Sequence, residues 1–444
     1  MRKILALLLA LLMAVSCISL LACGGEKNPD DGKKDPAVDP VDPGTDPGTD
    51  PVDPGTDPVD PGTDPGTDPV DPVVPDKKYL DDLPEQMDFG GDVVTILVSD
   101  DNGENNYVLI ENEDNYNDGD SVEFSVYTRH HTLQDRMNIA LQMSHDNSGA
   151  LKTKIQGQAQ SGSHDFDIIS GDLKQHIGFC IMNCILNMNK LPSIDLDQDY
   201  WNKTYTEKWG YKNCQYWATG DACATLLSQT ICLMINDDLL LKYNPDYSTD
   251  KLFETVEAGE WTTEKLLELT QGCYEDISGD GKSEDDVYGL RFSPDWRSGA
   301  LLKAAGYAPT EEGKSKWAVE LGGEHNLAVL DAVNKMTHQN PGAYMTRELR
   351  FRDDLAMAAV ESLGSLSGYR DYEGDFSVVP CPKRTAEDEY RSYTFEGLAM
   401  VGVTSTLQAE RFDEIGAAME LYASLGRQFV TEGFYEVALR TKYA

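Results

Sequence analysis

The segment Asp165–Leu173, with the sequence DFDIISGDL, decides the fold class of this chain. Its apolar part ends at Gly171 and Asp172, a pattern typical of a short buried strand that stops at a turn. Towards the N-terminus, periodicity and composition predict two further strands, at 92–99 and 138–144, and two helices, near 125–136 and 148–161. Strands that alternate with helices favour parallel βαβ units, so the predicted fold class is α/β.

The same alternation continues towards the C-terminus. Residues 225–243, TLLSQTICLMINDDLLLKY, predict a strand that runs into a helix. A helix capped by Thr262 is predicted in EWTTEKLLELTQGC, with Leu266, Leu269 and Cys273 on its inner face. Two more apolar strands are predicted in DFSVVPCPK at 375–383 and FEGLAMVGV at 395–403.

The first 25 residues, MRKILALLLALLMAVSCISLLACGG, predict an export signal at 1–22, because a basic start, an apolar core and a small residue before a cysteine coincide. The last four residues before the two glycines, Leu20, Leu21, Ala22 and Cys23, resemble the lipobox of bacterial lipoproteins. That resemblance implies that Cys23 is lipidated and begins the mature chain. An uncleaved anchor helix is the alternative, since about twenty apolar residues span a bilayer. Both interpretations place the body outside the cytoplasm.

Residues 23–78 form a predicted disordered linker rich in Pro, Asp, Gly and Thr. Between Asp39 and Pro72, Asp-Pro recurs every three or four residues, and proline at this density prevents both a helix and a sheet ladder. With almost nothing to bury, the segment is expected to be a solvated spacer stiffened by repulsion among its aspartates. At ~3.1 Å per residue it reaches on the order of 150 Å, enough to hold a body away from a membrane or through a cell wall.

The body from Lys78 to Ala444 has about 366 residues, which favours two lobes. The segment up to Lys78 carries −8 of the net charge of −40, so the body carries about −32. This balance disfavours nucleic acid and anionic membrane surfaces as partners.

Seven cysteines remain once Cys17 of the leader and Cys23 are set aside: Cys180, Cys184, Cys214, Cys223, Cys232, Cys273 and Cys381. An odd number cannot pair completely, and none of them makes a CxxC or a Cys/His metal spacing. We expect mostly buried free thiols in an exported protein of an organism that lives at low oxygen, with one or two disulfides left open.

Seven segments, in this order, resemble extracellular solute-binding family 1, the lipoprotein components of bacterial ABC importers: DFDIISGDL, LPSIDLDQDYWN, TGDACATLL, ICLMINDDLLLKY, GEWTTEKLLEL, DISGDGKSEDDVYG and FSVVPCPK. The family implies a two-lobed periplasmic-binding-protein-like fold of type II, with hinge strands between the lobes and the ligand in the cleft. By this resemblance, lobe 1 comprises 90–235 plus 376–405, and lobe 2 comprises 236–375 plus 406–444.

The resemblance implies a substrate-binding lipoprotein that captures a solute, with a sugar or oligosaccharide favoured, and delivers it to an ABC permease. Such a protein is expected to be a monomer that is lipid-anchored on the extracellular face of a bacterial cell membrane, here of a Gram-positive anaerobe. A cell-surface glycan hydrolase and a glycan-binding lipoprotein without an importer are the alternatives.

Candidate ligand-binding residues follow predicted strands, where loops and helix starts present polar groups. They are Asp100, Asp101, Asp172, Trp217, Asp221, Trp296 and Arg297. Aromatic rings stack on the apolar faces of sugars, while carboxylates and guanidinium groups bind the hydroxyls. For each tryptophan core packing is the competing interpretation, and for each aspartate it is an ordinary surface position.

A calcium loop is predicted in DISGDGKSEDDVYG, where Asp276, Ser278 and Asp280 alternate before Gly281. A backbone carbonyl of Lys282 and a water-mediated contact from Glu284 complete the expected ligand set. Position twelve of the loop is Val287 instead of an acid, and Asp286 falls one residue early. An ordinary Asp/Gly turn is the alternative; if calcium binds, a structural role away from the cleft is expected.

Catalytic signatures are missing from the sequence, which has no GxSxG, P-loop, HExxH or dinucleotide fingerprint. We therefore expect no enzymatic activity and no required cofactor, with calcium as the one candidate ion. Two glycosidase carboxylates leave no sequence signature, which keeps the hydrolase alternative open.

Two further expectations concern the hinge and the end of the chain. Strand crossings near Ile231–Asn236 and Phe376–Val379 predict a hinge that closes on the ligand. A helical face of apolar residues is predicted before Gly426, which can end the helix, and a second face after it: Phe412, Ile415, Met419 and Tyr422, then Phe434, Val437 and Ala438. In the family, a similar segment is followed by several dozen more residues, so we expect a C-terminal truncation that leaves apolar surface of lobe 2 uncovered.

Overall fold

The computed structural model describes residues 78–100, 121–208, 210, 212–312, 317–369, 371–395 and 397–435. The expected signal peptide, Cys23 and all of the expected linker except Lys78 lie outside these ranges. From Tyr79 onward the described residues belong to one compact unit. Within the described ranges, no helix has the length and apolar character needed to span a bilayer.

The first sheet has the strand order β12-β3-β1-β2. Its strands are β1 (Asp92–Ser99), β2 (Ile139–Asp146), β3 (Ile168–Asp172) and β12 (Ala399–Val403). β1 pairs in parallel with both β2 and β3, whereas β12 is antiparallel to β3. The predicted strands at 92–99 and 138–144 and the strand in DFDIISGDL are therefore confirmed, as is the parallel pairing.

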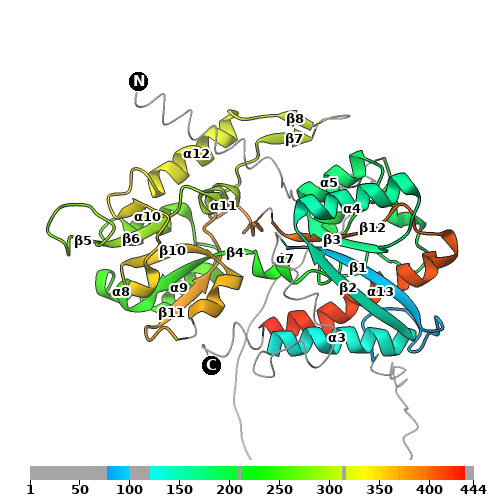
Figure 1. Ribbon diagram of the computed structural model, residues 1–444. Coiled ribbons are helices and arrows are strands. Elements are labelled where there is room, and N and C mark those ends of the chain that lie inside the picture. The colour runs from blue at the N-terminus through cyan, green and yellow to red at the C-terminus, as the bar shows by residue number, and fades with distance from the viewer. Residues whose placement is uncertain are drawn as a thin grey trace, which may run out of the picture. The chain divides into compact units, whose positions relative to one another are not determined.

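Helices cover both faces of this first sheet (Figure 1). They are α3 (Ser121–Met137), α4 (Ser148–Ser161), α5 (Leu173–Ile181) and α13 (Phe412–Leu425). Successive residues of β1 point to opposite faces: Ile96 packs in the core with Leu133 of α3, and Leu97 packs with Leu151 of α4. α13 packs beside α3, and α5 lies with α4.

The second sheet has the order β11-β4-β10-β6-β5, with β9 also beside β6. Its strands are β4 (Ile231–Asn236), β5 (Tyr274–Glu275), β6 (Val287–Phe292), β9 (Ala343–Met345), β10 (Ala356–Ser362) and β11 (Phe376–Val379). β4 is antiparallel to both β10 and β11, and β10 is parallel to β6. The sheet of the second lobe is thus mixed, with parallel and antiparallel pairs.

Among the described residues, five helices belong to the second lobe: α8 (Asp237–Tyr243), α9 (Thr249–Glu257), α10 (Thr263–Thr270), α11 (Trp296–Ala304) and α12 (Glu324–Met336). Their core includes Trp261, Leu266 and Leu290, all fully buried. Thr262 Oγ1 accepts a hydrogen bond from Lys265 N at 3.2 Å, which confirms the predicted cap of α10.

Shorter elements complete the described chain. They are α6 (Lys203–Lys208), α7 (Ala224–Ser228), β7 (Thr310–Glu312), β8 (Trp317–Val319), the 3-10 helices η3 (Met188–Lys190), η4 (Phe351–Asp353), η5 (Leu363–Tyr369) and η6 (Ala409–Arg411), and the π-helix η7 (Gly426–Thr431).

Two adjacent segments connect the lobes, at 228–231 and 393–398. Ile231 N donates to Tyr393 O at 2.8 Å, Phe395 N donates to Gln229 O at 3.1 Å, and Thr230 forms an isolated β-bridge with Thr394. The predicted hinge segments at 231–236 and 376–379 instead pair with each other as β4 and β11 inside the second sheet. The expectation holds at Ile231, where β4 begins at the connection, and is wrong for 376–379, because antiparallel pairing with β4 gives β11 its backbone hydrogen bonds inside the second lobe.

The helix α13 belongs to the first lobe, whereas the expected boundaries placed 406–444 in the second. Ser424 Oγ donates to Asp81 Oδ2 at 2.8 Å, and Tyr422 OH accepts from Arg129 Nη2 of α3 at 2.8 Å. Asp81 in turn holds Arg136 of α3 at 2.6 Å. Nearly all residues of α13 are buried, because this helix packs between α3 and the first sheet.

The apolar face that was expected to be uncovered is covered in the described residues. Ile415, Met419, Tyr422 and Phe434 are buried. The α-helix α13 ends at Leu425 with Gly426 at its C-cap, as expected, and the chain continues directly into the π-helix η7. Val437 and Ala438 lie outside the described residues.

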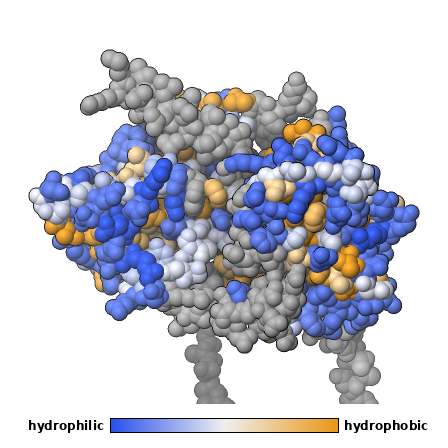
Figure 2. All heavy atoms as spheres, viewed as in Figure 1, coloured by the Kyte–Doolittle hydropathy of each residue, from blue (hydrophilic) through white to orange (hydrophobic). Residues whose placement is uncertain are grey.

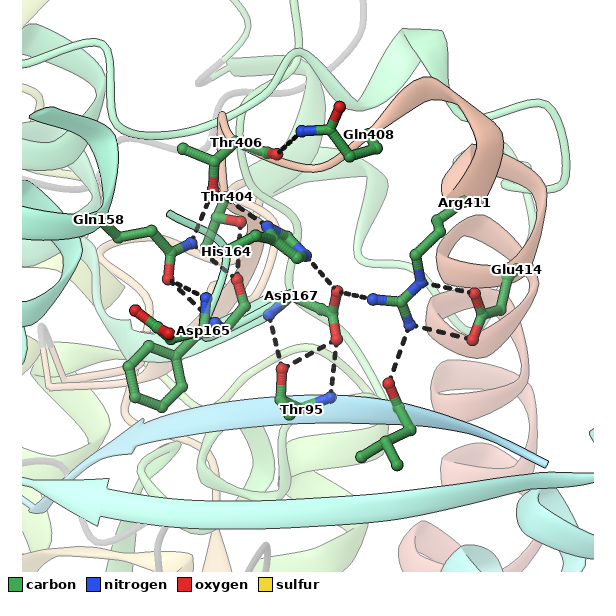
Figure 3. A network of polar contacts seen from close by, with 12 residues as sticks. Thr95, Gln158, His164, Asp165, Asp167, Thr404, Thr406, Gln408, Arg411 and Glu414 are labelled. Carbon is green, nitrogen blue, oxygen red and sulfur yellow. Dashed lines mark hydrogen bonds and ion pairs between the residues drawn. The ribbon is translucent and has the colours of Figure 1, made fainter. Parts of the chain in front are cut away.

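A buried polar network closes the amino end of the first sheet (Figure 3). The carboxylate of Asp167, just before β3, accepts hydrogen bonds from Thr95 N and Thr95 Oγ1 of β1 at 2.9 and 2.8 Å. His164 Nε2 lies 2.7 Å from the same carboxylate, and Arg411 Nη1 lies 2.6 Å from it. The other guanidinium nitrogens of Arg411 donate to both oxygens of Glu414 in α13 at 2.8 and 3.0 Å. The network joins three segments that are distant in sequence.

All seven cysteines of the body are free thiols, and five of them are buried. Burial raises the pKa of the Cys273 and Cys381 thiols to about 12, so both stay protonated at neutral pH. The structure confirms the expectation of mostly buried free thiols.

Hydrophilic residues dominate the visible surface of both lobes, and hydrophobic residues appear only in small groups (Figure 2). This pattern agrees with the strongly acidic composition of the chain.

Candidate functional site

The carboxyl ends of strands in both sheets lie beside the segments that connect the lobes. In the first lobe, Asp172 at the end of β3 pairs with Ala399, which directly follows the connecting segment 393–398. In the second lobe, Ser362 at the end of β10 pairs with Ile231, which follows the other connecting segment. Ligands of open α/β sheets bind beyond the carboxyl ends of strands, so these two edges form the candidate site.

Five polar residues, which we call the first-lobe group, gather at the carboxyl edge of the first sheet: Ser99, Asp100, His145, Asp172 and Gln175. Asp172 Oδ1 caps α5 by accepting a hydrogen bond from Gln175 N at 2.8 Å. Gln175 Nε2 donates to Ser99 Oγ, at the end of β1, at 2.9 Å. A carboxylate oxygen of Asp100 lies within hydrogen-bond distance of His145 Nδ1 of β2, and Asp100 keeps 35% of its side chain exposed. Two of the predicted ligand-binding residues, Asp100 and Asp172, therefore lie on one edge.

Three charged residues, which we call the second-lobe group, meet at the carboxyl ends of β6 and β10: Asp295, Arg297 and Glu361. Asp295 caps α11, and its Oδ1 accepts from Arg297 N at 3.0 Å. Arg297 Nη1 donates to Asp295 Oδ2 at 3.0 Å, and Arg297 Nη2 lies 3.5 Å from Glu361 Oε1. Because β10 runs parallel to β6, the ends of the two strands bring both carboxylates to one guanidinium.

Glu361 is the most buried member of the second-lobe group. Glu361 is only 7% exposed, and its charge acts on the nearby phenol of Tyr369. Burial first, and then the charge of Glu361, raise the pKa of Tyr369 to about 12, so this hydroxyl stays protonated and can donate a hydrogen bond. The group offers fixed donors and acceptors, a suitable arrangement for hydroxyl groups of a ligand.

Glu361 was missed in the sequence interpretation. Its signal was present: an acid directly after the apolar run AMAAV, at a strand end like those that singled out the aspartates. Its pairing with Arg297, 64 positions away, has no local signature.

Two predicted ligand-binding residues lie elsewhere. Asp221 binds Arg427 Nη1 at 3.2 Å and Thr431 Oγ1 at 2.5 Å, and burial raises the pKa of its carboxyl group. Trp217 is 5% exposed and packs edge-on against His176 in the core of the first lobe. The expected sugar-stacking role of Trp217 is replaced by core packing, since a ring this deeply buried has no face to offer a ligand.

Asp101 and the side chain of Trp296 lie outside the described part of the chain. Trp296 is placed as the first residue of α11, directly between Asp295 and Arg297.

The predicted calcium loop folds as a tight turn around Asp276. Its carboxylate accepts hydrogen bonds from Gly279 N at 2.6 Å and Gly281 N at 3.1 Å, and Ser278 Oγ donates to Asp280. These contacts are typical of an Asx-type turn.

Asp286, which the sequence pattern placed one residue early, closes the loop. Its carboxylate accepts from Ile277 N at 3.0 Å and Ser283 N at 2.8 Å. Burial opposes ionisation of Asp286, but these backbone donors outweigh it and hold its pKa below the usual value. Glu284 accepts from Thr346 Oγ1 at 3.0 Å and Lys282 Nζ donates to Pro341 O. Among the described residues, no three His, Cys, Asp or Glu side chains converge as metal ligands, and the calcium site stays a prediction.

Comparison with known proteins gives matches among solved structures. The structure is similar to the cyclic alpha-maltosyl-1,6-maltose binding protein from Arthrobacter globiformis, with a TM-score of 0.53, 16% identity and 78% of each chain covered. The fold is that of a type II periplasmic binding protein. This periplasmic-binding-protein fold confirms the predicted fold class and its two lobes.

Two further structures are similar to the chain, each over 78% of its length. UgpB from Mycobacterium tuberculosis in complex with glycerophosphocholine has 13% identity, a TM-score of 0.49 and 78% of its own chain covered. The maltose/maltodextrin-binding domain MalE from Bdellovibrio bacteriovorus bound to maltotriose has 16% identity, a TM-score of 0.46 and 79% of its own chain covered. No family model and no curated protein matches the sequence.

Proposed function

We propose that this chain is the substrate-binding lipoprotein of an ABC importer and captures a sugar or oligosaccharide between its lobes. The observation that carries the proposal is the second-lobe group, in which Arg297 is held between Asp295 and Glu361 at the hinge side of its sheet. The first-lobe group occupies the hinge side of the other sheet. A ligand that bridges the lobes therefore meets fixed polar groups from both.

The chemistry of the two groups favours a neutral polyhydroxylated ligand. Each sugar hydroxyl donates one hydrogen bond and accepts others, so carboxylates and a guanidinium group can serve the same hydroxyl from different sides. Arg297 already neutralises part of the charge of Asp295 and Glu361, which makes a free anion a poor fit. Trp296 is the proposed stacking residue, because an aromatic side chain at the start of α11 stands next to Arg297 in the chain.

The remaining parts of the proposal concern location and partners. The leader and Cys23 place the mature chain on the extracellular face of a bacterial cell membrane, held by a lipid. The linker carries the body towards its ligand, and an ABC permease in the membrane receives the solute. The protein is a monomer without enzymatic activity, and the ligand leaves it chemically unchanged.

Titration calorimetry on the purified soluble chain, with monosaccharides, linear and cyclic oligosaccharides, peptides and polyamines, tests this proposal. We expect binding to one sugar class, and we expect Arg297→Ala to weaken it by at least about tenfold, since hydrogen bonds to a charged group contribute about 1.5–3 kcal/mol. Lys335→Ala, which removes an exposed cation paired with Asp331 on α12, is the matched control and should bind as the wild type does.

Three outcomes contradict the proposal. The first is silence across all the sugars, and the second is equal affinity of the wild type and Arg297→Ala. The third is conversion of the sugar, seen by chromatography of the recovered ligand, which would favour the hydrolase alternative.

A further inference from the structure

A hollow lies on the second lobe, along the edge strand β11. Its volume is about 860 Å³, and it extends from η5 to the first turns of α8 and α9. The start of α8 follows the carboxyl end of β4, and β4 is antiparallel to β10. The hollow therefore has two different ends. At one of them α8 and α9 start, and this end lies at the edge of the second sheet opposite to Glu361. We call this hollow the β11 groove.

Exposed apolar side chains lie on the wall of the β11 groove. Leu241 of α8 is 53% exposed and Phe253 of α9 is 42% exposed, and both line the same hollow. Large apolar residues that are exposed together in a concave region mark a surface that binds another molecule. The same wall continues into the edge strand, where Phe376 and Val378 line the groove.

Four carboxylates surround this apolar wall: Asp237, Asp238, Asp250 and Asp375. None of them forms an ion pair with a residue in the described part of the chain. Asp237 Oδ2 accepts a hydrogen bond from Ser377 Oγ at 3.0 Å, whereas its Oδ1 is shielded from solvent and has no partner of normal geometry among the described residues. Burial is the main cause that raises the pKa of Asp237, and the charges of Asp375 and Asp238 add to it.

Helix starts explain part of this pattern, because acids in the first turn of a helix interact favourably with its dipole. That explanation covers Asp237, Asp238 and Asp250. It does not cover Asp375, which precedes β11, or the two exposed apolar residues beside it.

We propose that the β11 groove docks a basic amphipathic peptide segment of a partner protein. Lysine or arginine side chains of the segment would pair with the four aspartates, and its apolar side chains would cover Leu241 and Phe253. Charge complementarity selects this occupant, since like charges in contact are strongly disfavoured. A second copy of this chain, with a net charge of −40, is the wrong partner for an acidic groove. The proposal is independent of solute capture and adds a protein partner to it.

Fluorescence anisotropy tests the groove on the full chain. The probe is a labelled twelve-residue synthetic peptide in which lysines alternate with leucines and phenylalanines; two companions replace its lysines by glutamates or its apolar residues by serines. We expect binding of the first peptide only, weakening as salt rises. The double variant Asp238→Asn/Asp375→Asn should weaken it about tenfold, because it removes two carboxylates that pair with the lysines of the peptide.

Matched controls separate the groove from the general acidity of the surface. The pair Glu324→Gln/Asp331→Asn removes two exposed acids from α12, and Leu327→Ser removes a 56% exposed leucine from the same helix. Both should leave peptide affinity unchanged, whereas Phe253→Ser should reduce it. Thermal melts confirm that each variant is folded.

The proposal fails if the groove variants and the α12 controls weaken binding equally, because the peptide then responds only to net charge. It also fails if spermine displaces the peptide completely and binds with the same dependence on Asp238 and Asp375, which would make a small polycation the occupant. The peptide assay contains no sugar, so its failure does not affect the proposal of solute capture. In the same way, a failed sugar titration does not affect the proposal for the β11 groove.

Discussion

Arg411 and Asp167 are 244 positions apart in the chain, yet their side chains form an ion pair with an Nη1–Oδ1 distance of 2.6 Å. Asp167 is 1% exposed and Arg411 is 25% exposed, so the carboxylate depends on this partner and on Thr95 and His164 for compensation (Figure 3). The pair fixes the segment before α13 to the strands of the first lobe.

Removing one partner of this ion pair should destabilise the first lobe strongly. We expect Arg411→Ala and Asp167→Ala each to lower the free energy of unfolding by about 3–5 kcal/mol, because each leaves a buried or half-buried charge without its partner. The double variant should cost less than the sum of the two single variants. Urea unfolding monitored by circular dichroism measures this; strict additivity would contradict the coupling.

Acid should destabilise the first lobe through His176. This side chain is fully buried, and burial lowers its pKa below the usual value of 6.5, although its Nδ1 contact with Asp172 O at 3.1 Å opposes the effect. Below pH 6.5 the unfolded chain therefore binds a proton at His176 that the folded chain does not bind. The contribution of neutral His176 to the free energy of unfolding is complete above pH 6.5 and is lost as pH falls below it. Burial lowers the pKa of His338 as well, and it contributes in the same direction.

Melting temperatures measured between pH 8 and pH 5 check this sign. His176→Phe should flatten part of the decline, while His131→Ala, which alters an exposed histidine, should keep it. A melting temperature of the wild type that does not change below pH 6.5 would refute the role of buried histidine.

Solute binding should close the two lobes. A ligand stabilises the closed state only through contacts that it makes with both lobes, so saturating sugar should reduce the radius of gyration measured by X-ray scattering. Glu361→Gln should require more sugar for the same change, because it weakens the polar contacts of the second-lobe group. Identical scattering profiles with and without a sugar that calorimetry shows to bind would exclude closure.

Calcium is expected to stabilise the second lobe. If Asp276, Ser278 and Asp280 bind the ion, calcium raises the melting temperature by mass action, and chelator or Asp280→Ala removes the gain. Asp286→Ala should destabilise the loop in calcium and in chelator alike, because it removes the acceptor of Ile277 N and Ser283 N. A melting temperature unaffected by calcium would leave the loop as an ordinary turn.

The local elements of this protein were predictable because their signals lie within a few residues of each other. The helix expected at 148–161 has these same bounds: Asn147 caps its start by accepting from Ala150 N at 3.1 Å, and Gly162 ends it with a φ of 69°. The strand in DFDIISGDL ends at Asp172 because that side chain caps the next helix. Asp100 and Asp172 were predicted to follow strands, and the parallel pairing of β1 with β3 brings both to one edge of the first sheet.

By itself, then, the sequence determined the α/β alternation, the capped helices and the polar residues at strand ends, since each depends on short-range geometry and hydrophobic period. Only the tertiary structure decided that α13 packs on the first lobe, that β11 pairs with β4, that Trp217 is a core residue and that Glu361 meets Arg297. An apolar helix or strand can bury itself against any complementary surface. The choice is made by contacts between residues far apart in the chain, such as Ser424 with Asp81, for which no local pattern exists.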